Sequence, residues 1–305
     1  MISAFPKMRG RRASFSILLM GSLVILSLLL AACGTSTTTV TGSTPNPATP
    51  TLAPPSDLIT PGVLTVGSDT TYPPQEYIDP TTNKAAGFDV DLITAVAQRM
   101  GLQAKIVTTK FDTIIDDLAA KRFDVVISAV SDTPAREQKA QFVQYFKAGE
   151  SLLVQKGNPK NIKGTADLCG MPVGVQGGTT EQADLQTAND ACKKAGKPAI
   201  KVTVLQDQTA VINLLATNRV VATYQDSPVT DYYIKQNPGQ FEVGGSVVSQ
   251  TNEGIVIRKG DTSMFNAVQA AFNAVKADGT YHQLILKWGL TNEELTAVDP
   301  RVGYA

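Results

Sequence analysis

The residue with the clearest chemical potential in this 305-residue sequence is Arg136, which follows Thr133 and Pro134. Threonine before proline is typical of a helix N-cap and first helical position, so Arg136 should lie in the first turn. The helix dipole disfavours a cation there unless an anion lies against it. Because a guanidinium group can hold a carboxylate in bidentate fashion, Arg136 is a candidate anion ligand. An exposed arginine, or one paired with Asp132 or Glu137, is an equal alternative on helix position alone.

The segment Gly177-Gly178-Thr179-Thr180 offers a second place where an anion could bind. It lies between a predicted strand and a predicted helix, where two glycines permit a tight turn and leave backbone N–H groups open. The two threonine hydroxyls would add further donors. Glycines at such a turn usually have no role beyond the turn, so this pattern is weak by itself.

Three acids show how position separates binding roles from structural ones. Asp226 follows a predicted strand, and Ser227 before Pro228 is the better N-cap, which frees Asp226 for another role. An exposed loop acid is the alternative for Asp226. Asp89 and Asp91 invite a catalytic or metal-binding interpretation. Asp89 fits an N-cap, however, and Asp91 the first turn of the same helix, so the sequence predicts structural roles for both.

The cysteines and the single histidine limit redox and metal chemistry. Cys169 and Cys192 have 22 residues between them, and in an exported protein such a pair is expected to form a disulfide. Closing this loop would contribute on the order of 3 kcal/mol to stability. A metal site or a catalytic thiol is a weaker interpretation, because the spacing is not that of a zinc knuckle and His282 is the sole histidine. The sequence therefore predicts no metal and no cofactor.

The order of predicted elements places these residues in an α/β fold. Short strands alternate with helices from Val63, and two successive strand-helix-strand units favour a parallel sheet covered by helices. The pattern restarts at Val173 and predicts a second sheet. The late helices have no third sheet to join, so the chain should cross between lobes near 148–152 and 246–252. The predicted strands are 63–67, 105–108, 125–128, 173–176, 202–205, 220–224 and 254–257, and the predicted helices are 89–100, 112–121, 180–194, 208–217, 228–235, 262–276 and 281–288.

The N-terminal segment predicts export. Four bases between residues 7 and 12 precede an uncharged stretch, 13–32, which ends at Leu30-Ala31-Ala32-Cys33. Bases before a short apolar segment with small residues at its end are typical of a signal peptide. A permanent transmembrane helix is the weaker alternative, because no cluster of bases follows Cys33. Residues 33–57 have too few large apolar side chains to fold and should form an extended, disordered tether.

The charge balance argues against nucleic acid as a partner. Removing residues 1–32 takes away four bases and no acid, which leaves 23 Lys and Arg residues against 27 Asp and Glu, a net charge of −4. Nucleic-acid binding usually needs a basic face. The roughly 250 residues after the tether suffice for one large domain or two ordinary ones.

A series of short motifs occurs in one order along residues 60–290. They are Gly67-Ser68-Asp69-Thr70-Thr71-Tyr72-Pro73-Pro74, Gly87-Phe88-Asp89-Val90-Asp91-Leu92, Lys110-Phe111-Asp112, Phe123-Asp124-Val125-Val126, Thr133-Pro134-Ala135-Arg136, Gln176-Gly177-Gly178-Thr179-Thr180 and Asp278-Gly279-Thr280-Tyr281. This ordered set resembles the solute-binding proteins of amino-acid ABC transporters, the bacterial extracellular solute-binding proteins of family 3. The resemblance implies a two-lobe periplasmic-binding-protein-like fold of type II, with a mostly parallel sheet in each lobe and two hinge strands between them.

The two predicted crossings between the lobes set the domain boundaries. Lobe 1 is expected to comprise 58–148 and 249–305, and lobe 2 to comprise 149–248. The start of the chain is similar to a bacterial lipoprotein signal, whose lipobox has Leu three positions before the cysteine and small residues between. This implies cleavage after residue 32 and acylation of the Cys33 sulfur.

The resemblance also implies which residues contact a bound amino acid. Arg136 would clamp the α-carboxylate, with Thr179 and Thr180 donating to it from the second lobe, and Asp226 would pair with the α-ammonium group, assisted by two serines. Asp69 would reach a polar or cationic side chain between two aromatic rings, although aromatic residues are usually core. Gln75 stands where the family commonly has an aromatic residue. The predicted ligand-binding residues are Asp69, Tyr72, Phe111, Ser128, Ser131, Arg136, Gly177, Thr179, Thr180 and Asp226.

These inferences predict a receptor without enzymatic activity, anchored by lipid at Cys33 outside the cytoplasm. It would act as a monomer, capture a free amino acid and deliver it to ABC permease subunits. A dehydratase-type enzyme on the same fold is one alternative, with Glu181 as the nearest proton donor. The helix dipole explains Glu181 more simply, and His282 lies far from these loops in sequence. A sensory receptor that binds the same ligand is the other alternative.

Overall fold

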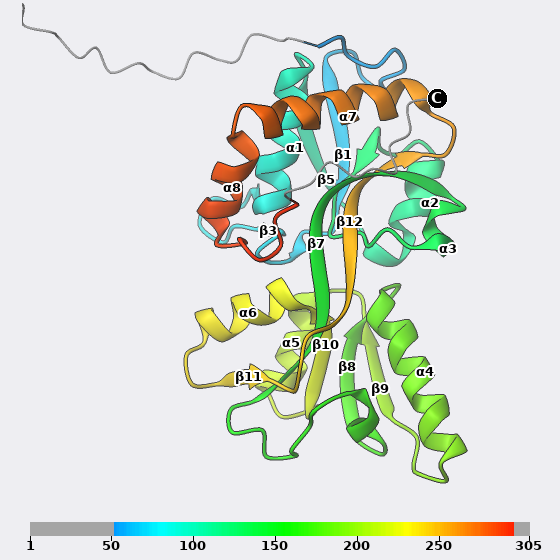
Figure 1. Cartoon of the computed structure of the whole chain (residues 1–305), viewed down its shortest axis with the longest axis vertical. Helices are drawn as coiled ribbons and strands as arrows, with labels where there is room; N and C mark the ends of the chain where they lie inside the picture. Colours follow the sequence, from blue (N-terminus) through cyan, green and yellow to red (C-terminus); the bar gives the residue numbers. More distant parts are fainter. Residues whose placement is uncertain (1–51, 296–305) are drawn as a thin grey trace, which may run out of the picture. The chain divides into compact units, whose positions relative to one another are not determined.

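The computed structural model describes residues 52–295, which belong to one unit of the chain (Figure 1). The predicted signal peptide, Cys33 and most of the predicted tether lie outside the described residues. Between residues 52 and 295, no helix is both long and apolar enough to cross a membrane. All residues that the sequence selects as ligand-binding lie inside the described range.

A nine-stranded sheet runs through this part of the chain, in the order β5, β1, β6, β12, β7, β10, β8, β9, with β11 paired to β7. At one end β1 pairs in parallel with β5 and β6, and at the other end β8 pairs in parallel with β9 and β10. The strands are β1 (Val63–Ser68), β5 (Gln103–Thr108), β6 (Val125–Val126), β7 (Ala140–Gln155), β8 (Pro172–Gln176), β9 (Lys201–Leu205), β10 (Ala222–Asp226), β11 (Phe241–Val243) and β12 (Val248–Arg258).

Two long antiparallel strands, β7 and β12, join the two parallel parts. They pair from Ala140 opposite Arg258 to Glu150 opposite Val248, with two register shifts between. Figure 1 shows both strands running from one group of helices to the other. We call the elements on the β1 side lobe 1 and those on the β8 side lobe 2. Because β12 also pairs with β6 and β7 with β10, one hydrogen-bonded path connects the two sheets that the sequence predicts separately.

Helices flank the sheet in both lobes. Lobe 1 carries α1 (Phe88–Arg99), the 3₁₀ turn η1 (Phe111–Thr113), α2 (Ile114–Ala119), α3 (Pro134–Glu137), α7 (Thr262–Ala277) and α8 (Thr280–Trp288). Lobe 2 carries η2 (Thr165–Leu168), α4 (Thr180–Lys194), α5 (Gln208–Ala216) and α6 (Ser227–Gln236). The exact residue boundaries of the lobes stay a prediction, since β7 and β12 run through both.

Each lobe has its own apolar core. In lobe 1, Leu92 and Val96 of α1 lie in one buried cluster with Met264 of α7 and Ile285 of α8. In lobe 2, a separate cluster gathers side chains of β8, β10 and α4. Burying one such aliphatic side chain stabilises the fold by roughly 1.5–3 kcal/mol. The two cores are separate, and a smaller buried cluster of Tyr72, Ala129 and Val229 packs residues of one lobe against the other.

A second, three-stranded sheet in lobe 1 is absent from the sequence-based prediction. Its strands are β2 (Thr71–Tyr72), β3 (Glu76–Ile78) and β4 (Ala85–Ala86), joined in antiparallel order. Strands of two or three residues are too short to show an alternating pattern. This small sheet matters for function because it holds Tyr72 and Glu76 against the end of β1.

Candidate functional site

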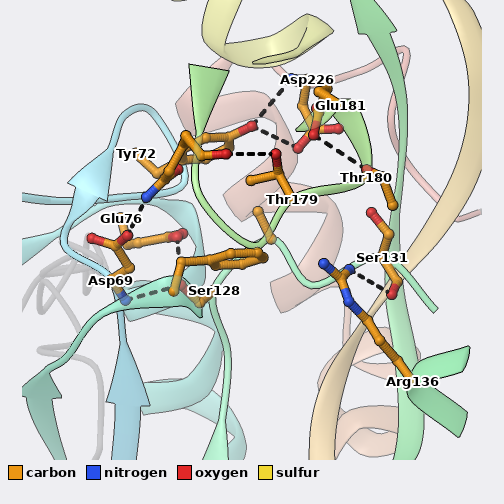
Figure 2. Close-up of a pocket in the computed structure, with 13 residues that line it drawn as sticks. Asp69, Tyr72, Glu76, Ser128, Ser131, Arg136, Thr179, Thr180, Glu181 and Asp226 are labelled. Carbon is orange, nitrogen blue, oxygen red and sulfur yellow. Dashed lines mark hydrogen bonds between the residues drawn. The ribbon is translucent and has the colours of Figure 1, made fainter. Parts of the chain in front are cut away.

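A pocket lies between residues of lobe 1 and residues of lobe 2 (Figure 2). Most of the residues that line it are polar or charged. The lining residues are Asp69, Tyr72, Glu76, Phe111, Ser128, Ala129, Ser131, Arg136, Gln176, Thr179, Thr180, Glu181 and Asp226. Nine of the ten residues that the sequence selects for ligand binding are therefore brought together in one place.

Strand ends explain why these residues meet. Asp69 directly follows β1, Ser128 lies just beyond β6, and Gln176 and Asp226 end β8 and β10. In open α/β sheets, ligands bind beyond the carboxyl ends of parallel strands. Here the two parallel parts present those ends to each other, so each lobe contributes one wall.

Arg136 reaches from lobe 1 toward lobe 2. Its backbone N–H donates to the Thr133 hydroxyl at 3.3 Å, so the predicted N-cap forms and sets the start of α3. The guanidinium donates through Nη1 to the Ser131 carbonyl at 3.0 Å and through Nη2 to the Gly178 carbonyl at 3.1 Å. It also lies over the Phe111 ring, 5.4 Å from its centroid. Arginine has five N–H donors, and these two bonds use two of them.

Asp226 lies on the opposite wall, paired with Tyr72. The Tyr72 hydroxyl donates to Asp226 Oδ2 at 2.8 Å and accepts from the Asp226 backbone N–H at 3.1 Å. Burial raises the pKa of Asp226 to about 7, because the charged carboxylate loses its hydration. Tyr72 therefore connects the lobes directly, in addition to facing the pocket.

Asp69 and Ser128 form the end of the pocket beside β1. Asp69 accepts from the Thr71 hydroxyl at 2.9 Å and from the Gln176 amide of lobe 2 at 2.5 Å. The Ser128 hydroxyl accepts from the Asp69 backbone N–H and donates to Glu76 Oε1, both at 2.9 Å. Burial raises the pKa of Asp69 to about 6.

The sequence of residues 64–291 matches the family model for bacterial extracellular solute-binding proteins, family 3. The chain belongs to this family. The polar pocket between two lobes agrees with that assignment, and so do the solved structures that share the fold.

Curated relatives of this family-3 protein are named for the amino acids they bind. The chain is 32% identical over 232 residues to the L-cystine-binding protein TcyA of Bacillus subtilis (strain 168), covering 74% of this chain and 81% of that protein. It is 32% identical over 237 residues to the lysine/arginine/ornithine-binding periplasmic protein of Escherichia coli (strain K12), covering 75% and 88%.

Solved structures give the same fold. An ancestral arginine-binding protein bound to arginine matches with a TM-score of 0.68 and 35% identity, over 74% of this chain and 98% of that one. An ancestral amino acid-binding protein described as a precursor of cyclohexadienyl dehydratase matches with a TM-score of 0.65 and 33% identity, over 74% and 95%. The predicted two-lobe, type II periplasmic-binding-protein fold is thus confirmed.

In this family-3 protein, Gly177 does not line the pocket. Its backbone N–H donates to the Leu205 carbonyl at 2.9 Å and extends the pairing of β8 with β9. The Gly178 N–H donates to the Gln182 side chain at 2.8 Å. The backbone donors that the sequence predicts to be open at this turn therefore have protein partners here.

Thr179 and Thr180 line the pocket where α4 begins. Thr179 is the N-cap of α4, and its hydroxyl accepts from the Gln182 N–H at 3.2 Å and donates to the Gln176 carbonyl at 2.9 Å. The Thr180 hydroxyl donates to Glu181 Oε2 at 3.2 Å. The strand-to-helix turn was thus placed correctly from the sequence.

The N-cap predictions for Asp89 and Ser227 are wrong by one or two residues. The helix α1 begins at Phe88 after the N-cap Gly87, and Asp89 is buried inside the first turn. Asp89 instead accepts from Tyr145 and from the backbone of lobe 1. Asp226, not Ser227, is the N-cap of α6, but its side chain makes no capping bond and remains directed at Tyr72.

Four pocket residues were not selected from the sequence: Glu76, Ala129, Gln176 and Glu181. Glu76 lies on β3 of the small sheet, which carries no clear pattern. The sequence explains Glu181 by the helix dipole alone, yet this residue lines the pocket and is only 2% exposed. Burial raises its pKa well above the ordinary value, and its Oε1 has no hydrogen-bond donor within residues 52–295. Acids far apart in sequence thus meet in a site that has one arginine.

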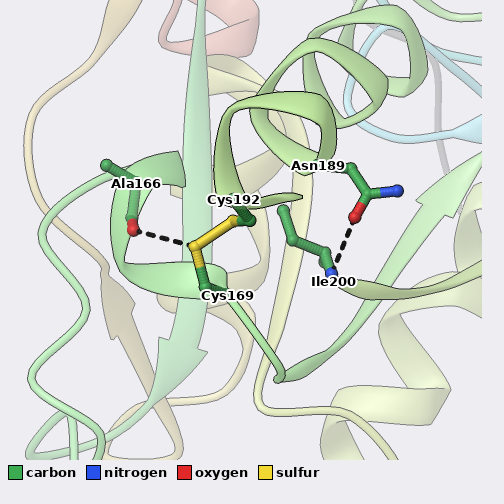
Figure 3. Close-up of a disulfide and its surroundings, with 5 residues drawn as sticks. All are labelled: Ala166, Cys169, Asn189, Cys192 and Ile200. Carbon is green, nitrogen blue, oxygen red and sulfur yellow. Dashed lines mark hydrogen bonds between the residues drawn. A yellow bond between two sulfur atoms is a disulfide. The ribbon is translucent and has the colours of Figure 1, made fainter. Parts of the chain in front are cut away.

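The predicted pair of cysteines lies at the far end of α4 from the pocket. Cys169, next to η2, and Cys192, on α4, form a disulfide (Figure 3). Close by, the Ile200 N–H donates to the Asn189 side chain at 2.8 Å. Because Thr179 and Thr180 begin the same helix, the disulfide fixes the element that forms one pocket wall.

Replacing Cys169 and Cys192 together with serine should lower the free energy of unfolding by about 3 kcal/mol, which corresponds to a midpoint roughly 6–12 °C lower. Without the disulfide, the unfolded chain has more conformational entropy, which favours unfolding. Calorimetry measures the midpoint. Reductant should lower the midpoint of the unsubstituted protein and leave that of the double variant unchanged. Equal midpoints without reductant would mean that the disulfide contributes nothing.

Proposed function

We propose that this protein captures a free amino acid between its lobes and delivers it to an ABC permease. One observation carries the proposal: Arg136 and Asp226 line the same pocket from opposite lobes. A guanidinium suits an α-carboxylate and a carboxylate suits an α-ammonium group, so the pair matches the two groups that all free amino acids share. The amino-acid-binding names of the relatives agree with this choice.

Closure of the lobes would follow from such a ligand. Arg136 and Ser131 would hold the amino acid from lobe 1, and Thr179, Thr180 and Asp226 from lobe 2. Contacts available only when both walls are near favour the closed form over the open one. The hydrogen bonds from Tyr72 to Asp226 and from Arg136 to the Gly178 carbonyl already join the two walls, so groups of both lobes lie within reach of one small ligand.

The remaining side chains favour a polar or basic ligand side chain. Asp69 follows β1, and Phe111 gives the same pocket an apolar face. A carboxylate there would accept from a ligand amide, hydroxyl or cation. Apolar amino acids offer no such donor and should bind more weakly.

The location of the protein is inferred from its N-terminal sequence and its family. We infer that Cys33 is acylated after cleavage, so that the protein works outside the cytoplasm as a monomer on a lipid anchor. The tether would keep the lobes close to the permease while leaving them free to open. Substitution of Cys33 by serine should release the protein from the membrane fraction of producing cells, as seen on an immunoblot.

A thermal-shift screen against the common amino acids tests the binding function, using the chain without residues 1–33. A ligand at about 100 times its dissociation constant adds roughly 2.7 kcal/mol, or about 5–10 °C in this size range. We expect one or a few polar or basic amino acids to give such a shift. No shift with any amino acid would disprove the proposed function.

A dehydratase-type enzyme is a second candidate, favoured by Glu181. A buried carboxyl group with a raised pKa inside the pocket could donate a proton. His282 would not assist it, because it lies on α8, contacts Glu294 and does not line the pocket. Proton NMR of an incubated ligand distinguishes the two functions: a receptor leaves the spectrum unchanged, whereas an enzyme converts the ligand.

A further inference from the structure

Two buried carboxyl groups, Glu76 and Asp89, meet beneath the pocket. Glu76 lines the pocket and is 1% exposed, and Asp89 is fully buried behind it on α1. Glu76 Oε1 accepts from the Ser128 hydroxyl at 2.9 Å (Figure 2). Asp89 Oδ2 accepts from the Ala129 N–H at 3.1 Å and from the Tyr145 hydroxyl at 2.6 Å. One oxygen of each group is thus already satisfied.

The second oxygen of each carboxyl group lacks a hydrogen-bond donor. Glu76 Oε2 and Asp89 Oδ1 are both buried, and neither has a hydrogen-bond donor among the described residues. The two carboxyl groups lie close enough to act on each other's charge. Two ionised carboxylates are acceptors only and repel each other. A single proton between them would supply the missing donor and remove one charge, as in other carboxyl pairs.

The groups around this pair are acids or neutral donors. Asp69 follows β1, Glu253 lies on β12, and Tyr145 on β7 donates to Asp89. Burial and the neighbouring acids raise the pKa of Glu76, and burial raises that of Asp89 to about 6. Among the described residues that line the pocket, four are acids and Arg136 is the single cation.

The proposed function uses Arg136 for the α-carboxylate and Asp226 for the α-ammonium group, which leaves Asp69, Glu76 and Glu181 without a cation. We propose that Glu76 shares one proton with Asp89 in the empty pocket and releases it when a ligand with a positively charged side chain binds. Glu76 is then a specificity-determining residue. This inference rests on the proposed function.

This exchange of the shared proton for a ligand cation makes the pocket prefer charged over neutral ligand side chains. A guanidinium or ammonium group beside Glu76 brings both N–H donors and positive charge, so the proton leaves to solvent and Glu76 ionises. A neutral amide or urea brings donors without charge, and the proton stays. Arginine and citrulline test this difference well, because they differ little in shape and by one charge.

Titration calorimetry of the purified protein at pH 7, in two buffers with different enthalpies of ionisation, measures the protons released. Arginine should release a fraction of one proton per molecule bound, citrulline none, and arginine should bind at least roughly tenfold more tightly. Citrulline binding within threefold of arginine, or arginine binding without proton release, would overturn the inference.

Two variants assign the effect to this pair. Glu76→Gln should abolish proton release and lower arginine affinity roughly 10- to 100-fold, while citrulline affinity changes less than about threefold. Asp89→Asn supplies an N–H donor in place of the proton, so arginine should bind without releasing one. Glu242→Gln, which removes an acid that does not line the pocket, is the matched control and should behave as the unsubstituted protein.

The outcomes separate this inference from the proposed function. If neutral amino acids bind and basic ones do not, the protein remains an amino-acid receptor and only the role of Glu76 is wrong. If no amino acid binds, the proposed function and the role of Glu76 are both wrong. If a variant unfolds, the two-buffer measurement on the unsubstituted protein still decides, because its result does not depend on any substitution.

Discussion

Replacing Arg136 with alanine should abolish the thermal shift produced by the best amino-acid ligand. Two charge-assisted hydrogen bonds to a carboxylate contribute about 1.5–3 kcal/mol each, so affinity should fall roughly 10²- to 10⁴-fold. The α-carboxylate would also remain buried without a cation opposite it, in a pocket whose other charged lining residues are acids. Titration calorimetry gives the affinity directly.

Two other arginine substitutions make this result specific. Arg136→Lys keeps the charge and loses the planar fork, so its affinity should lie between those of the alanine variant and the unsubstituted protein. Arg219→Ala removes an exposed arginine outside the pocket and should leave binding unchanged. An Arg136→Ala variant that binds normally would refute the carboxylate clamp, whichever amino acid is the ligand.

Helices and parallel strands were predictable because their signals are local. The helix 180–194 matches α4 in full, because it follows a predicted strand and turn within one stretch of sequence. The Thr133 cap and its proline likewise placed Arg136 correctly. Asp89 shows the limit of such signals: an acid before an apolar helix fits a cap, but burial against Tyr145 requires tertiary structure.

The sheet and the charge of the pocket were less predictable. The strands β7 and β12 pair antiparallel over a long stretch. No short sequence pattern in either strand predicts that the other is its partner. The acids at 69, 76, 181 and 226 come from four separate segments, so their shared pocket emerges only when both lobes are placed. The family resemblance selected nine lining residues, whereas Glu76 and Glu181 could be recognised only from their burial in the structure.

Gly178 bears directly on whether the lobes can close. It has a φ of +81°, and a Cβ added there would lie 2.6 Å from the Cα of Asp112, on η1 of the opposite lobe. The same approach is held by the Gln206 amide, which donates to Asp112 Oδ2 at 2.9 Å, and by Arg136 on the Gly178 carbonyl. Backbone lies on both sides of this contact, so a side chain cannot simply turn away.

Gly178→Ala should therefore weaken ligand binding by at least about tenfold, because the closed form now contains a clash that the open form lacks; that factor corresponds to about 1.4 kcal/mol. It should also lower stability by roughly 1–2 kcal/mol through the left-handed backbone conformation.

Gly196→Ala separates the two effects. Gly196 has a φ of +69° at the end of α4, and an added Cβ there meets no atom within 4 Å. This control should lose similar stability and keep full affinity, as measured by calorimetric melting and by titration. Equal affinities for the two alanine variants would show that close approach of Gly178 to Asp112 is not required for capture. A selective loss at Gly178 would instead establish that binding needs the lobes as near as this contact allows.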